Sequence, residues 1–162
     1  MKELFLFTDG SADEETGIGY GAYLLVDNPE LPSDLLKKQV VLKRFENTSS
    51  SRLEIQTLIW ALGDIQHFPA KIKVFSDSQN IIGLPERKER LEKNNFRSKG
   101  NRLLNNAELY QEFYQKTEHL SIEFVKVSGH MRSLEKNSFD LIFTLVDRAS
   151  RKALRMDRGE MK

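Results

Sequence analysis

The sequence predicts an α/β fold in which one mixed sheet carries helices on its faces. Three strand-like segments come first, and helical and strand-like segments then alternate to the end of the chain. The chain has 162 residues, of which 39% are hydrophobic and 30% charged, as is ordinary for a globular protein. We expect residues 1–162 to form a single domain, because no linker, internal repeat or low-complexity tract divides them.

The first three strands are expected to form an antiparallel meander. Residues 4–7 are an apolar run typical of a buried strand, and residues 20–26 predict a second strand that begins near Gly21. Residues 27–38 include two of the four prolines and therefore mark an exposed connection, after which residues 39–45 predict a third strand. The predicted loop between the first two strands contains three glycines, Gly10, Gly17 and Gly19.

The segment that follows is predicted to be an amphipathic helix. Apolar residues recur at i, i+3, i+4, i+7 and i+10 from Ile55 to Ile65, and the helix is expected to follow Ser51 and to end near Phe68-Pro69. The remaining predicted elements are a strand at 71–75, helices at 78–83, 86–95 and 104–118, a strand at 121–127, and a closing amphipathic helix with apolar residues from Phe139 to Leu154.

The composition excludes several classes of protein. No apolar run approaches the roughly 20 residues that a membrane span needs, and the start Met1-Lys2-Glu3 lacks the layout of a secretory signal. We therefore expect a cytoplasmic protein with no membrane partner. The chain has zero cysteines, which rules out disulfides, thiolate zinc sites and a thiol nucleophile. Any bound metal would need oxygen ligands.

Two segments are basic although the net charge is only +1. Residues 87–102 carry seven Lys or Arg against two Glu, and residues 148–162 carry six against two acidic residues. A local excess of this kind is typical of a surface that binds nucleic acid. Solvated helix faces would explain either segment equally well when it is considered alone.

Four carboxylates lie where a predicted element ends or turns. Asp9 follows the first strand and Asp77 follows the fourth, while Glu54 begins the inward face of a helix and Asp147 lies within the last helix, shortly after His130. Open α/β sheets bind ligands beyond the carboxyl ends of their strands. If folding brings these acids together, they would hold a divalent metal, which indicates phosphodiester chemistry.

Each of these acids, taken alone, also has an explanation that needs no metal. Asp is common in turns and at helix N-caps, and Glu three residues after a serine can close a capping box. His130 alone would be an ordinary loop histidine. The four alternatives are a turn at Asp9-Gly10, a capping box that links Ser51 and Glu54, an N-cap at Asp77, and a surface pair between Asp147 and Arg151. They do not explain why the first and fourth strands both end in Asp.

Seven short motifs follow one another along the chain in a specific order. They are Thr8-Asp9-Gly10-Ser11, Gly19-Tyr20-Gly21-Ala22, Thr48-Ser49-Ser50-Ser51-Arg52-Leu53-Glu54, Ser76-Asp77-Ser78-Gln79, Asn105-Asn106-Ala107-Glu108-Leu109-Tyr110, Val125-Lys126-Val127-Ser128-Gly129-His130 and Val146-Asp147-Arg148-Ala149-Ser150-Arg151. Taken together, these motifs resemble type 1 ribonuclease H. The resemblance runs from Leu4 to about Leu154 and depends on no single motif.

The resemblance implies a ribonuclease H-like, five-stranded mixed sheet, with the first three strands antiparallel and helices on both faces. It also implies a monomeric endoribonuclease that hydrolyses the RNA strand of RNA/DNA hybrids and leaves 5′-phosphate and 3′-hydroxyl ends. The implied cofactor is Mg²⁺ or Mn²⁺, as two ions. The implied metal ligands are Asp9, Glu54, Asp77 and Asp147, with His130 as the catalytic loop histidine. The implied nucleic-acid contacts are Gly10, Ser11, Ser50, Ser51, Arg52, Arg97, Lys99 and Asn105.

The chain departs from the family pattern at two places that bear on function. Ser50-Ser51 stands where the family commonly has an Asn pair, and Asp147 follows His130 by 17 residues, a longer spacing than is usual, whereas Asp140 satisfies the shorter spacing. We prefer Asp147 as the fourth ligand because Arg151 follows it as the family's last helix requires. A nucleic-acid-binding module that does not cleave, or a DNA nuclease on the same sheet, remains the alternative function.

Overall fold

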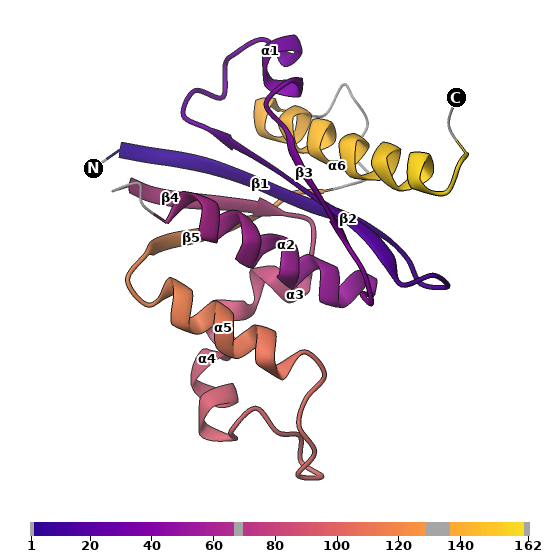
Figure 1. The fold of residues 1–162 in the computed structure, drawn as a ribbon. Coiled ribbons are helices and arrows are strands. Elements are labelled where there is room, and N and C mark those ends of the chain that lie inside the picture. The colour runs from indigo at the N-terminus through magenta and orange to yellow at the C-terminus, as the bar shows by residue number, and fades with distance from the viewer. Residues whose placement is uncertain (1, 67–69, 129–136, 161–162) are drawn as a thin grey trace.

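The computed structural model describes residues 2–66, 70–128 and 137–160, and Figure 1 shows how their helices and strands are arranged. The strands are β1 (Lys2–Asp13), β2 (Ile18–Val26), β3 (Val41–Phe45), β4 (Ala70–Ser76) and β5 (Ser121–Lys126). The helices are α1 (Ser33–Lys37), α2 (Ser50–Ile65), α3 (Gln79–Ile82), α4 (Leu84–Lys93), α5 (Ala107–Thr117) and α6 (Ser138–Asp157). Among the described residues, no helix is both long and apolar enough to cross a membrane.

The strands form one five-stranded sheet in the order β3-β2-β1-β4-β5. β1 pairs antiparallel with β2, and β2 pairs antiparallel with β3. On its other side β1 pairs parallel with β4, which in turn pairs parallel with β5. The predicted mixed sheet, with its first three strands antiparallel, is confirmed.

β1 is longer than the predicted strand at 4–7. Its parallel pairing with β4 stops at Phe7 opposite Phe75, but its antiparallel pairing with β2 continues to Asp13 opposite Ile18. The polar residues after Phe7 therefore stay in the sheet through backbone hydrogen bonds to one neighbour. A strand paired on one side and only half-buried has no strong hydrophobic signal, and for this reason the sequence indicated a loop.

Two hydrophobic cores lie on opposite faces of the sheet, because successive residues of a strand point to opposite sides. Leu6 belongs to the core beneath α2 and α5, whereas Phe7 belongs to the core beneath α6. Figure 1 shows α2 and α6 on opposite sides of the sheet, with α4 and α5 extending away below α2. Burying a side chain of this size contributes about 1.5–3 kcal/mol, so the two cores fix β1 from both faces.

Glycines allow α2 to approach the sheet closely. A Cβ atom at Gly10 or Gly19 would lie 2.8 Å from Cδ2 of Leu53, and one at Gly21 would lie 2.3 Å from Oγ1 of Thr57. Real Cβ atoms do not approach other heavy atoms this closely, so larger residues at these positions would push the helix outward. The three glycines, which the sequence placed partly in a loop, thus form the strand surface on which α2 rests.

Several element boundaries differ from the prediction. α2 begins at Ser50 with Ser49 as its N-cap, and it ends at Ile65, earlier than the predicted end. The predicted exposed connection at 27–38 contains a short helix, α1, which the sequence did not predict. The helix predicted at 86–95 is α4, which begins and ends two residues earlier, and the helix predicted at 104–118 is the shorter α5. β3 begins at Val41 instead of residue 39.

Replacing Gly21 with Ala is expected to lower the free energy of unfolding by about 1–3 kcal/mol, because the new methyl group overlaps Thr57 and displaces α2. Urea unfolding followed by circular dichroism measures the change. Gly63→Ala is the matched control: the glycine lies within α2 and its added Cβ meets only Nζ of Lys116, at 3.4 Å. Alanine favours helix there, so stability should rise by up to about 1 kcal/mol. Equal effects of the two substitutions would contradict the close-packing argument.

Candidate active site

Two neighbouring parallel strands deliver Asp9 and Asp77 to the same edge of the sheet. Asp77 comes directly after the last residue of β4, and Asp9 lies two residues beyond Phe7, where β1 and β4 stop pairing. Asp9 is still held in register by β2, opposite Ala22. Asp77 follows the end of β4 as expected, but Asp9 does not follow the end of β1, because the strand continues to Asp13. Asp9 marks instead the place where the pairing of β1 with β4 ends.

The helix α6 brings Asp147 against Asp9. α6 packs on β1 and β2, and the side chains of Asp9 and Asp147 are in hydrogen-bonding contact. One turn further along α6, the buried hydroxyl of Ser150 lies 3.1 Å from the hydroxyl of Ser11 on β1. This second link fixes the helix to the strand two residues from Asp9.

Asp9 is the electrostatic centre of the group. Burial, the hydrogen bond with Asp147 and the negative charges of Asp77 and Asp147 raise the pKa of Asp9 from 3.8 to about 9, although the backbone of Gly10 opposes the shift. The protonated form of Asp9 can donate to the carboxylate of Asp147, which is the arrangement expected when two acids share a site. A cation placed there would substitute for that proton.

Glu54 is half-buried and points toward the same region from α2. Its Oε2 atom accepts a hydrogen bond of 2.7 Å from the hydroxyl of Ser78. Burial raises the pKa of Glu54 and the charge of Asp77 adds to the rise, whereas the bond from Ser78 lowers it. The capping box between Ser51 and Glu54 is not formed, because Ser49 is the N-cap and accepts from the backbone of Arg52.

Of the other three alternatives, two are wrong and one is present. Asp9 and Gly10 do not form a turn, because both lie within β1 and pair with β2. Asp77 does not cap α3: the N-cap is Ser78, which accepts from the amide of Ile81, and the side chain of Asp77 is exposed. Asp147 does pair with Arg151, whose Nε donates to Oδ1 across 2.9 Å. Because a carboxylate has two oxygens, this surface pair is compatible with the contact to Asp9.

Asp140 serves a different purpose from Asp147. It closes a capping box at the start of α6: its amide donates to Oδ1 of Asn137 across 2.9 Å, and its Oδ2 accepts from the amide of Asn137 across 3.2 Å. It precedes Asp147 by seven residues, which corresponds to roughly 10 Å along a helix axis. Asp140 therefore has a complete local role in starting the helix.

Residues expected to contact nucleic acid surround the N-terminus of α2. Gly10 lies against Leu53, and Ser11 contacts Ser150. The amide of Ser50 donates to Oε1 of Glu14 across 3.0 Å. The remaining two are Ser51, whose hydroxyl lies 3.4 Å from that of Ser49, and Arg52, whose guanidinium donates to Glu108 and to Asn106 Oδ1.

The other expected contacts lie on the segment between α4 and α5. Arg97 and Lys99 are exposed and line a hollow of about 310 Å³ together with Arg90. Nη1 of Arg97 donates to the backbone carbonyl of Asn101 across 3.1 Å, which holds the turn in place. Asn105 is exposed just before α5. His130, the expected loop histidine, lies outside the described residues.

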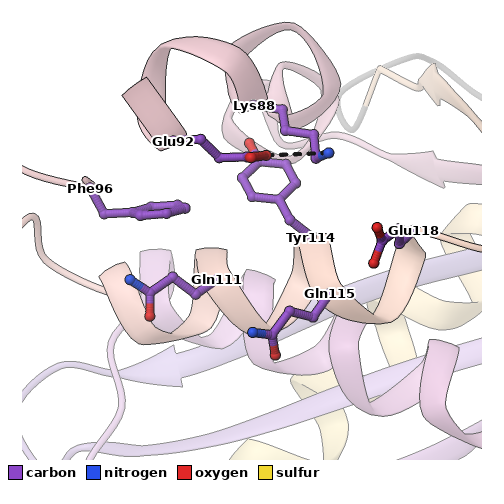
Figure 2. Close-up of a pocket in the computed structure, with 7 residues that line it drawn as sticks. All are labelled: Lys88, Glu92, Phe96, Gln111, Tyr114, Gln115 and Glu118. Carbon is purple, nitrogen blue, oxygen red and sulfur yellow. Dashed lines mark ion pairs between the residues drawn. The ribbon is translucent and has the colours of Figure 1, made fainter. Parts of the chain in front are cut away.

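A separate hollow lies between α4 and α5, and none of the four acids lines it. Its volume is about 220 Å³, and Phe96 and Tyr114 contribute aromatic walls. Figure 2 shows these rings above Gln111 and Gln115, with Lys88 and Glu92 paired across 3.2 Å at the rim. The hydroxyl of Tyr114 donates to the carbonyl of Leu84. The hollow therefore belongs to the packing of the two helices, away from the acidic group.

Asp9 and Asp147 form a contacting pair, whereas Asp77 acts on Asp9 and on Glu54 through its charge. Within residues 2–66, 70–128 and 137–160, no three His, Cys, Asp or Glu side chains are clustered tightly enough to hold a metal ion as they stand. Like charges keep apart, and a cation between them would relieve the repulsion. The donor set itself suits a hard cation such as Mg²⁺, because all four side chains offer carboxylate oxygens.

Sequence reasoning missed the serines that support the acids. Ser78 binds Glu54, and Ser150 joins α6 to β1. Ser78 did carry a signal, since it stands beside Asp77 and opens a predicted helix. Ser150 carried none, because a serine in a helix is usually a surface residue.

Comparison with known proteins agrees with the fold and shows the family. The family model RNase H matches residues 1–153. Ribonuclease H of Caldicellulosiruptor saccharolyticus is 30% identical over 145 residues, covering 88% of this chain and 94% of that protein. Ribonuclease H of Clostridium botulinum is 27% identical over 146 residues, covering 86% and 92%.

Solved structures show the same fold. The solution structure of the PFV RNase H domain superposes with a TM-score of 0.72 at 14% identity and covers 92% of both chains. A foamy viral protease-reverse transcriptase in complex with RNA/DNA hybrid superposes with a TM-score of 0.68 at 11% identity, covering 92% of this chain and 20% of that one. These matches and the acidic sheet edge define a nuclease of the hydrolase class. The chain belongs to the RNase H family, in its type 1 branch.

The metal-free protein is expected to lose stability as the pH rises. The folded pKa of Asp9, about 9, is above its ordinary value of 3.8, so its contribution is complete below about pH 4 and is lost as the pH rises toward 9. Asp9→Asn stays uncharged, so its stability should exceed that of the wild type by a margin that grows from pH 5 to pH 9. Urea unfolding in EDTA measures this margin, with the exposed Asp34→Asn as control. Parallel pH profiles for wild type and Asp9→Asn would refute the prediction.

Proposed function

We propose that this protein is a metal-dependent endoribonuclease that hydrolyses the RNA strand of RNA/DNA hybrids and leaves 5′-phosphate and 3′-hydroxyl ends. The observation that carries the proposal is the contact of Asp9 with Asp147, within reach of the charge of Asp77. Placing a partly buried carboxylate beside two other acids is costly without a cation. RNase H is also the name of both curated relatives, and the hybrid is the ligand of one foamy viral neighbour.

We infer that Asp9, Glu54, Asp77 and Asp147 hold Mg²⁺ or Mn²⁺, as two ions. When bound, such a pair supplies a water of lowered pKa and stabilises charge on the leaving 3′ oxygen. The chain itself contributes the orientation of the ligands. β1 and β4 fix the backbone beside Asp9 and Asp77, while α2 and α6 hold the other two carboxylates.

His130 is assigned the movement of protons. Imidazole titrates near neutral pH, so it can give a proton to a displaced oxygen or take one from water. The histidine follows Gly129 after the end of β5, and β5 is the neighbour of β4, which leads to Asp77. Removal of this side chain should slow turnover without abolishing it.

We assign the hybrid to the surface that runs from the N-terminus of α2 to the segment before α5. Arg97 and Lys99 would contact phosphates without regard to sequence, with an affinity that falls as salt rises. Contacts that distinguish RNA from DNA must reach 2′-hydroxyls, and the residues assigned to this role are Gly10, Ser11, Ser50, Ser51, Arg52 and Asn105. Since all four acids come from one chain, a monomer has the whole site.

The decisive measurement is cleavage of an end-labelled RNA/DNA hybrid in Mg²⁺, with the product ends identified by phosphatase and ligation. Wild-type protein should cut the RNA strand, and Asp77→Asn should lose activity by a hundredfold or more, on the order of the loss for a transition-state charge group. Because Asp77 is exposed, the variant should fold normally, and the exposed Asp34→Asn is its control. Faster cutting of duplex DNA would favour a DNA nuclease, and binding without cleavage would favour a non-catalytic module.

The fourth ligand is tested by comparing Asp147→Asn with Asp140→Asn. Asp147→Asn should abolish turnover and keep the fold, because the side chain faces Asp9 and not a core. Asp140→Asn should keep turnover and lose about 0.5–2 kcal/mol of stability through its weakened capping box. Steady-state cleavage and thermal unfolding of both variants measure the two effects. Loss of turnover only in Asp140→Asn would reverse the assignment.

A further inference from the structure

We propose that Ser78 is a positioning residue that holds the carboxylate of Glu54 in its metal-binding orientation. The hydroxyl of Ser78 donates to Oε2 of Glu54 across 2.7 Å. Ser78 is buried, with 8% of its surface exposed, so water does not compete strongly for this bond. The inference rests on the proposed function in one respect, namely that Glu54 is a metal ligand.

The hydrogen bonds around Ser78 allow only one direction of donation. Its oxygen accepts from the amide of Ile81, whose nitrogen lies 3.3 Å away, because an amide can only donate. The single hydroxyl proton then has Glu54 as its acceptor. One carboxylate oxygen of Glu54 is thereby held by the protein, and the other oxygen, Oε1, is the one assigned to the metal.

The same residue also shapes the chain next to Asp77. The amide of Ser78 donates to the hydroxyl of Ser76 across 3.1 Å, so a buried serine stands on each side of Asp77. The carbonyl of Ser76 accepts from the amide of Val127, which ties this turn to the end of β5. Ser78 thus links the backbone next to Asp77 to the side chain of Glu54, which lies 24 residues earlier in the chain than Ser78.

A helix cap alone would not require this arrangement. Ser49 shows the simpler case, since it caps α2 by accepting from the amide of Arg52 and is not bonded to any of the four acids. Ser78 performs the equivalent function for α3, which has only four residues, and gives its proton to Glu54 in addition. Outer partners of metal ligands commonly change metal affinity by about 10–100-fold when they are removed.

The test is calorimetric titration of Mg²⁺ into the metal-free protein without nucleic acid. Ser78→Ala should bind Mg²⁺ about tenfold more weakly, whereas Ser78→Thr, which keeps the hydroxyl, should bind like the wild type. Ser78→Gly separates the two functions of the residue, because glycine is nearly as good an N-cap as serine but has no hydroxyl. It should show the same loss of affinity as Ser78→Ala with a smaller loss of stability.

Two controls make each outcome decisive. Ser49→Ala weakens the cap of the helix that bears Glu54 and should lower the melting temperature while leaving the Mg²⁺ affinity unchanged. Glu54→Gln tests the proposed function: unchanged Mg²⁺ binding in this variant would remove Glu54 from the ligand set. If Glu54→Gln weakens binding but both Ser78→Ala and Ser78→Gly bind Mg²⁺ like the wild type, the positioning role of Ser78 is wrong and the proposed function stands.

Discussion

The whole site depends on how the fold holds a partly buried carboxyl group at Asp9 beside two other acids. Its pKa of about 9 shows that burial and neighbouring acids strongly disfavour the charged form. The surrounding structure compensates through the backbone: β1 is paired with β2 beyond this point and with β4 up to Phe7, and a hydrophobic core lies on each face. A strand fixed in this way can keep a carboxyl group in an unfavourable environment. In a loop, the same group could move into water.

Each remaining acid comes from a different element, and each element has its own attachment near the site. α2 rests on the glycine surface of β1 and β2, α6 is joined to β1 through Ser150 and Ser11, and the turn after β4 is held by Ser76 and Ser78. Each attachment lies close in sequence to its carboxylate, within one helical turn on the helices and within two residues on the strands. The repulsion between the acids is therefore resisted locally, close to where it acts.

The sequence predicted the arrangement of the sheet and the acids better than their immediate surroundings. Asp9 and Asp77 could be placed because strand ends and parallel neighbours follow from hydrophobic patterns over many residues. The capping residue of α2 could not, because Ser49, Ser50 and Ser51 are chemically equivalent candidates and only the backbone geometry selects Ser49. The partners of Ser78 and Ser150 lie 24 and 139 residues away, and a contact at that separation leaves no local pattern.

Charge is separated within the protein in a way that suits an anionic substrate. The net charge of +1 conceals a basic segment at 87–102 and an acidic group at the end of the parallel strands. A nucleic-acid backbone is attracted to Arg97 and Lys99 but repelled by the carboxylates near the ends of the parallel strands. Under the proposed function the phosphate to be cut can enter only after cations have reversed the local sign, because direct contact between phosphate and carboxylate is repulsive. Metal binding would thus precede productive substrate binding, whereas attraction to the basic segment would not require metal.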